Sequence, residues 1–169
     1  FHEGDIFTAA AVTTKVKWEE TKTTQRRLMV VTDDYVVVAD YVEPGDGEKH
    51  TFDWLMHPKG FQGIQAAAKE STGTEADMGY KNKPRGRPIG NVKTYKYKSP
   101  ARILFKQSSD EGTLKLDVHA LWPRQAEFRI GELKDKRPFS LRTQGESCYY
   151  STVIKPYYKG TPAIQKAEA

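Results

Sequence analysis

Residues 81 to 98, KNKPRGRPIGNVKTYKYK, combine seven basic side chains with two tyrosines and contain no acidic residue. The planar guanidinium groups of Arg85 and Arg87 suit bidentate contacts with carboxylates or sulfates. Flat aromatic rings can stack on the faces of sugars. We therefore predict a ligand-binding set in this segment and at Trp122, which stands at the end of an expected strand. Its members are Lys83, Arg85, Arg87, Lys93, Tyr95, Lys96, Tyr97, Lys98, Trp122 and Arg124.

The excess positive charge of the chain is concentrated around this segment. Residues 81–106 hold nine Lys and Arg and no Asp or Glu, so the remainder carries 27 − 9 = 18 basic against 22 acidic residues. The whole net charge of +5 therefore arises within this window. Such a local concentration points to a polyanionic partner. The alternative is a solvated loop followed by an edge strand that lysines protect.

The elements that must position these residues are strands. Runs of β-branched and aromatic residues alternate with turn-forming clusters, which predicts an all-β fold, an antiparallel β-sandwich of the jelly-roll or lectin-like type with one long basic loop. Residues 58–91 break this rhythm, and only Gln65 to Glu70 look helical. The expected strands are 6–14, 26–32, 35–42, 49–57, 92–98, 102–107, 113–122, 126–131, 139–143 and 147–154.

Alternation within the strands predicts which side chains lie inside. Residues 113–122 should bury a row of apolar residues that includes Leu116 and Val118, and leave Lys115, Asp117 and His119 on a wet face. The clearest hairpin spans 26–42, with Asp33 and Asp34 in its turn.

Aromatic residues outside the basic segment are candidates either for the core or for a ligand surface. Trp54 shares a strand face with Phe52 and is expected in the core. In the doublet Tyr149–Tyr150, as in Tyr157–Tyr158, one ring should point inward and the other outward, so the outer ring is a further candidate for ligand contact.

The length of 169 residues indicates one domain, residues 1–160, followed by a tail or linker at 161–169. Cys148 is the single cysteine and is expected to be a small buried residue. No apolar run is long enough for a membrane span, so we expect no membrane partner. We predict no catalytic residue, metal or cofactor. Two alternatives stay open: His57 or His119 as a catalytic base beside a tyrosine, and a metal site at Asp40, Asp53 and His57.

The stretch QRRLMVVTDDYVVVADYVEPGDGEKHTFDWLMHPKG resembles the C-terminal β-sandwich of heparinase II/III-like polysaccharide lyases, which include oligoalginate lyases. That family's pattern has a basic residue at the start of a strand, an Asp-Tyr turn, an Asp at the end of the next strand, and a His-x-x-x-Trp-x-x-His segment. The matching positions here are Arg26, Arg27, Asp34, Tyr35, Asp40, His50, Trp54 and His57.

The resemblance implies an accessory sandwich, because the family's chemistry also requires a helical toroid that this sequence does not show. We therefore expect a non-catalytic carbohydrate-binding module for an anionic polysaccharide, alginate-like or sulfated, that is secreted or periplasmic and accompanies the catalytic domain of a larger parent protein. The first alternative is a sandwich fragment that contributes to the cleft of a polysaccharide lyase. The second is a single-stranded nucleic-acid binder, although the sequence shows no RRM, KH or zinc-knuckle signature.

Overall fold

The chain folds into strands joined by turns. The computed structural model describes residues 2–18, 21–58, 63–66, 90–98, 101–109, 112–132 and 138–158, and each of the ten expected strands overlaps a strand in these ranges. The strands are β1 (His2–Glu3), β2 (Thr8–Trp18), β3 (Thr21–Val31), β4 (Val36–Pro44), β5 (His50–Met56), β6 (Gly63–Ala66), β7 (Gly90–Lys98), β8 (Ala101–Ser109), β9 (Gly112–Trp122), β10 (Gln125–Glu132), β11 (Phe139–Gly145) and β12 (Cys148–Tyr158).

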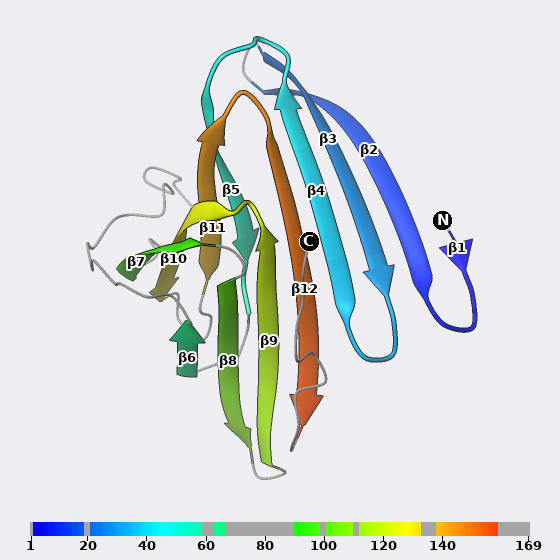
Figure 1. Cartoon of the computed structure of the whole chain (residues 1–169), viewed down its shortest axis with the longest axis vertical. Helices are drawn as coiled ribbons and strands as arrows, with labels where there is room; N and C mark the ends of the chain where they lie inside the picture. Colours follow the sequence, from blue (N-terminus) through cyan, green and yellow to red (C-terminus); the bar gives the residue numbers. More distant parts are fainter. Residues whose placement is uncertain are drawn as a thin grey trace.

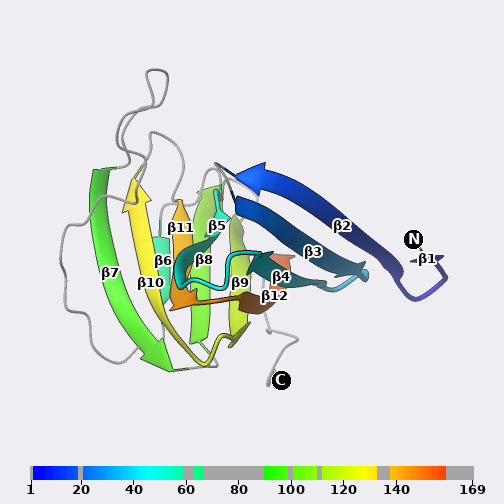
Figure 2. The ribbon, with the colours of Figure 1, turned by 90° about the horizontal axis from the view of Figure 1, so that it is seen from above.

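These strands form two antiparallel sheets (Figure 1). The large sheet has eight strands in the order β1-β2-β3-β4-β12-β9-β8-β6, and the small sheet has four in the order β5-β11-β10-β7. The β-sandwich predicted from the alternating pattern is thereby confirmed. Strands β1 to β3 extend to one side, away from the small sheet (Figure 2).

The core lies between the two sheets and is rich in aromatic rings. Phe139 of β11 is fully buried, and its ring centroid lies 5.1 Å from that of Phe105 on β8, 5.5 Å from Phe128 and 5.9 Å from Trp54. Because Phe105 belongs to the large sheet and the other rings to the small one, these contacts join the two layers. Trp54 is 7% exposed, which confirms its predicted core position.

The predicted hairpin at 26–42 is also confirmed, as β3 and β4. Val31 is paired with Val36, and the turn between them is closed by Thr32, whose backbone N–H donates to the carbonyl of Tyr35 at 3.0 Å. The hydroxyl oxygen of Thr32 also accepts hydrogen bonds from the backbone N–H groups of Asp34 and Tyr35. Local side-chain bonds of this kind are typical of turns.

Two expectations about individual segments are wrong. Gln65 and Ala66 are not helical but lie in β6, where pairing with Leu104 and Ile103 of β8 outweighs local helix propensity. The second face of residues 113–122 is not wet, since Asp117 is 1% exposed and His119 is 8% exposed. The alternation itself is right, but both faces of β9 are covered, and the Asp117 carboxylate is tolerated there because it is paired with Arg102.

Two predictions concern segments beyond the described part of the chain, the long basic loop and the C-terminal tail. The predicted loop residues Lys83, Arg85 and Arg87 and the predicted tail at 161–169 lie outside the described residues. Within the described ranges, no helix is long and apolar enough to cross a membrane.

Candidate functional site

Strand β7 carries the described part of the predicted basic set. Lys93 and Lys96 are exposed, whereas Tyr95 is half-buried and its ring centroid lies 5.9 Å from that of Phe128 in the core. For Tyr97 and Lys98, the structure describes only the backbone, which pairs with Ala126 and Gln125 at the start of β10. Tyr95 therefore contributes to the sandwich core, and less of its ring remains for a ligand.

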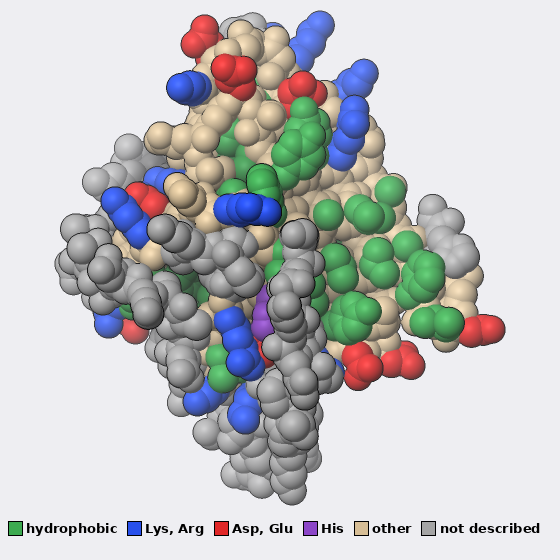
Figure 3. Space-filling model, viewed as in Figure 1, with side chains coloured by type: hydrophobic (Ala, Val, Ile, Leu, Met, Phe, Trp, Pro, Cys, Tyr) green, Lys and Arg blue, Asp and Glu red, His purple; other side chains and the backbone are tan. Residues whose placement is uncertain are grey.

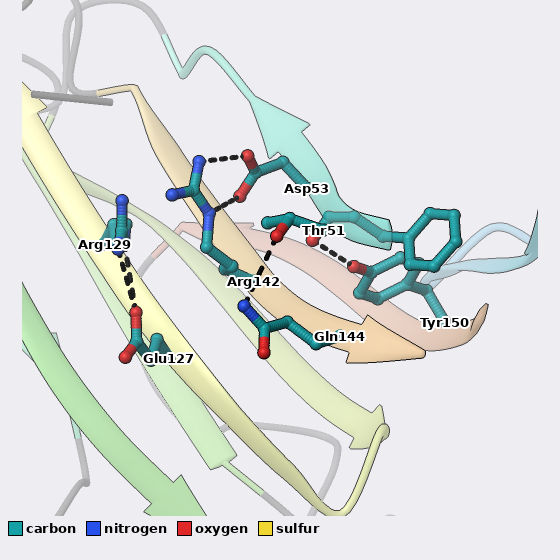
Figure 4. A network of polar contacts seen from close by, with 8 residues as sticks. Thr51, Asp53, Glu127, Arg129, Arg142, Gln144 and Tyr150 are labelled. Atoms are coloured by element: carbon teal, nitrogen blue, oxygen red, sulfur yellow. Dashed lines mark hydrogen bonds and ion pairs between the residues drawn. The ribbon is translucent and has the colours of Figure 1, made fainter. Parts of the chain in front are cut away.

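Lys96 belongs to a row of charges that crosses the outer face of the small sheet. Direct pairing places Lys96 opposite Glu127, Glu127 opposite Arg142, and Arg142 opposite Asp53. The signs alternate along this row, and Arg142 donates from Nε to Oδ1 of Asp53 at 2.9 Å (Figure 4). Bonding to Asp53 also raises the pKa of Arg142. This face is therefore close to charge balance and has little attraction for a polyanion.

Arg102 lies in the same basic window of the sequence but is compensated inside the fold. Its guanidinium donates from Nε to Oδ1 of Asp117 at 2.8 Å and from Nη2 to Oδ2 at 2.6 Å. Nε2 of His119 lies 3.2 Å from Oδ1 of Asp117. Burial by itself raises the pKa of the Asp117 carboxyl, but the contacts with His119 and Arg102 outweigh burial and hold that pKa below its ordinary value.

A different surface gathers aromatic rings and arginines. On the face of the large sheet that points away from the core, Arg26 of β3 is paired with Tyr41 of β4, and Tyr41 with Tyr149 of β12. The Tyr41 and Tyr149 ring centroids are 4.4 Å apart, and Cζ of Arg26 lies 5.7 Å from the Tyr41 centroid. Tyr149 is 57% exposed while Tyr150 is 3% exposed, which confirms the alternation predicted for this doublet.

Trp122 and Arg124 extend this group. Trp122 is paired with Ser151 of β12 after a register shift, so it shares the outward face of Ser151 and Tyr149. Residues in such a diagonal relation lie about 7 to 8 Å apart at the backbone. Trp122 is 39% exposed, and Cζ of Arg124 lies 5.6 Å from its ring centroid. We call Arg26, Tyr41, Tyr149, Trp122 and Arg124 the arginine–aromatic row.

Sequence reasoning found three members of the row and missed two. Trp122 and Arg124 were predicted as ligand contacts from their place at a strand end, and the outer ring of the doublet, which the structure identifies as Tyr149, was a further candidate. Arg26 was named only as a motif position and Tyr41 not at all, because their position beside Tyr149 depends on β4 pairing with β12. No local pattern reports a pairing between strands so distant in the sequence.

The residues that carry the family resemblance have mainly structural contacts. Asp40 of β4 accepts hydrogen bonds from Arg27 Nε at 2.6 Å and from Trp54 Nε1 at 2.9 Å. His50 Nε2 lies 3.0 Å from Oδ1 of Asp46, and bonding to His50 lowers the pKa of Asp46 to about 2. The motif therefore holds β3, β4 and β5 together.

The alternative metal site is not assembled. Asp40 points inward to Trp54, whereas Asp53 is on the opposite face of β5 and binds Arg142. Among the described residues, which include Asp40, Asp53 and His57, no three His, Cys, Asp or Glu side chains are grouped to hold a metal ion. The proposal of a histidine base also finds no support at His119, because its ring is buried against Asp117.

Cys148 is 4% exposed, which confirms its predicted burial, and this desolvation raises the pKa of its thiol to about 11. Because the thiolate is the reactive form, we expect iodoacetamide at about pH 8 to leave the folded protein unmodified. The same protein in concentrated urea should be alkylated at once. Mass spectrometry of both samples checks this, and equal labelling of the folded and unfolded protein would contradict the burial of the thiol.

No protein-family model matches the sequence, and no curated protein matches it. Among solved structures, the chain is similar to the crystal structure of a protein described as a "putative aldose 1-epimerase" from Escherichia coli K12. The sequence identity is 11%, the TM-score is 0.53, and the alignment covers 94% of this chain and 68% of that chain. At this identity the likeness shows a shared fold alone, and the class it defines is an all-β antiparallel sandwich.

Proposed function

We propose that this β-sandwich is a non-catalytic module that binds an anionic polysaccharide along the arginine–aromatic row. The observation that carries the proposal is the row itself: two tyrosine rings in tilted contact and an exposed tryptophan on one face, with an arginine over a ring at each end. Aromatic faces provide apolar area for sugar rings at a low entropic cost. The guanidinium groups provide planar donors for carboxylates or sulfates.

The direction of the row suits an extended polymer. Four of its members lie on β3, β4, β12 and β9, which are consecutive neighbours in the large sheet, and Arg124 follows the end of β9. Adjacent strands are about 4.8 Å apart, which is close to the length of one sugar ring in an extended chain. A polysaccharide lying across the strands would therefore place about one sugar unit over each strand of the row. The basic residues at 83, 85 and 87 would add to the general electrostatic attraction between the chain and a polyanion.

The family resemblance and the fold neighbour support the same reading. A C-terminal sandwich of the heparinase II/III-like type would act beside the catalytic domain of a larger, secreted or periplasmic parent protein. The description of the Escherichia coli neighbour connects the shared fold with sugars. Alginate-like and sulfated chains both offer the negative groups that the arginines require.

Affinity electrophoresis or calorimetry of the chain with alginate, heparin and a neutral glucan tests the proposal. We expect binding to the two anionic polymers at low salt, weaker binding as salt rises, and little binding to the glucan. No binding to either anionic polymer at low salt would overturn the proposal. Tighter binding to a single-stranded oligonucleotide would assign the surface to nucleic acid, and unsaturated sugar products absorbing in the ultraviolet would assign catalysis.

Substitutions then locate the binding surface. Trp122→Ala and Tyr149→Ala should each weaken binding about fivefold, the loss of one stacked ring. Arg26→Gln should weaken binding and reduce its salt dependence. Lys96→Gln removes the same charge from the charge-balanced face of the small sheet, so it should change affinity little. If Lys96→Gln weakened binding more than Arg26→Gln, the ligand would bind along β7 instead.

A further inference from the structure

Strand β2 forms an edge of the large sheet that is open to a further strand over most of its length. β2 pairs with β3 along all of Thr8–Trp18, but on its other side β1 pairs only with Thr8 and Ala9. No other described strand pairs with residues 10–18. This part of β2 therefore offers a row of backbone N–H and C=O groups to an incoming strand, and it contains no proline that would prevent pairing.

Strands β2 and β3 also lack a core of their own. Within the described chain, the hydrophobic core cluster includes no residue of either strand. Among the residues that the structure describes, eight of the ten exposed large hydrophobic side chains fall between positions 6 and 35: Ile6, Phe7, Val12, Val16, Leu28, Met29, Val31 and Tyr35. In Figure 3, hydrophobic side chains are spread over the area of β2, β3 and β4. A strand pair with so little apolar cover gains stability when further strands are added.

The free edge is complementary to itself when two copies run antiparallel. Its midpoint is Thr14, so a two-fold axis there places Thr14 opposite Thr14 of the second copy and Val12 opposite Val16 of the second copy. Val12, Thr14 and Val16 lie on one face of the sheet, the same face that carries the side chains of Met29 and Asp40. The pairing would therefore cover Val12 and Val16, which are 56% and 41% exposed.

The charges of the edge agree with the same register. β2 carries Lys15 and Lys17 and no acidic residue. Lysines on an edge usually oppose association. At this register, however, Lys15 faces Thr13 of the second copy and Lys17 faces Ala11, so no lysine meets a lysine directly. Parallel pairing in register would place each lysine opposite its equivalent.

We infer that β2 is a dimerisation edge, at which two copies of this chain join their large sheets antiparallel through residues 10–18. The partner is thus a second copy of the chain. Thr13 also lies opposite Arg26, so Lys15 of the second copy would extend the arginine–aromatic row on the same face. The dimer would present two such rows on one continuous sheet. Formation of the dimer does not depend on the binding of a glycan.

Sedimentation velocity of the purified chain tests this inference. The wild-type protein should change from monomer to dimer as its concentration rises to about 0.1 mM. This concentration is well above a micromolar Kd, so most copies would be in the dimer. Thr14→Glu places two carboxylates opposite each other at the axis, which should weaken the dimer about fivefold. Thr13→Glu makes the same charge change one residue away but faces Lys15, so it should leave the dimer intact or strengthen it.

Measuring the stability of both variants shows whether an effect on the dimer is separate from an effect on folding. Both threonines are exposed, so urea unfolding of the monomers should be nearly unchanged by either substitution. A chain that stays monomeric throughout the concentration range would overturn the inference and leave the edge to an unlike partner. Equal weakening by Thr13→Glu and Thr14→Glu would overturn the proposed register and its two-fold axis.

Discussion

Asp117→Ala is expected to lower the free energy of unfolding by about 3 kcal/mol, because it removes the carboxylate from a buried ion pair. Asp117 is 1% exposed and accepts hydrogen bonds from both Nε and Nη2 of Arg102. His119 lies on its other side. Such a loss is a large fraction of the 5 to 15 kcal/mol that is roughly typical for a domain. Urea unfolding followed by circular dichroism measures it.

Glu127→Ala provides the control, because Glu127 also binds an arginine, Arg129, but its carboxylate is 37% exposed. Its loss should cost less than about 1 kcal/mol. The pH dependence gives a second check through Asp117→Asn. Since the folded pKa of Asp117 lies below 3.8, its charge stabilises the protein above that pH, and this contribution is lost as the pH falls toward the folded value. The wild-type advantage over Asp117→Asn should therefore narrow below pH 3.8; an advantage that persists there would contradict the role of the carboxylate.

The fold was predictable because it depends on local patterns. Period-two alternation and turn residues placed ten strands, and the chemistry of Thr32 to Tyr35 closes the best-predicted hairpin. The order of those strands in the sheets was not predictable. β12 sits between β4 and β9, so residues more than a hundred positions apart become neighbours. Alternation predicts that the two faces of a strand differ, but it does not predict what covers each face.

The candidate site was harder to predict for the same reason. The basic window contains no acidic residue of its own, yet the fold brings Asp117 to Arg102 and Glu127 to Lys96 from other strands. Charge counted along the sequence therefore overstates the charge available at the surface. The arginine–aromatic row, by contrast, draws on residues as distant as Arg26 and Tyr149. Local patterns indicate single members of the row, but they do not show that these residues lie side by side.

Asp40→Ala should cost about 3 kcal/mol of stability, because it leaves the indole N–H of Trp54 without its acceptor inside the core. Asp40 is 9% exposed and is the point at which β3, β4 and β5 are tied together, through Arg27 and Trp54. Bonding to Asp40 also raises the pKa of Arg27. Arg27, Asp40 and Trp54 belong to the stretch that resembles the lyase sandwich. In this protein, these positions of the motif therefore stabilise the fold.

Asp53→Ala is the matched control, since Asp53 forms the same two-point contact with Arg142 on the outer face of the small sheet, where its carboxylate is 31% exposed. It should cost less than about 1 kcal/mol. A double-mutant cycle of Asp40→Ala with Trp54→Phe isolates the buried bond, because phenylalanine needs no acceptor. A coupling of about 1 kcal/mol or more is expected. A coupling near zero would mean that the carboxylate acts through Arg27 alone, and that the link between the two sheets depends on packing of the rings.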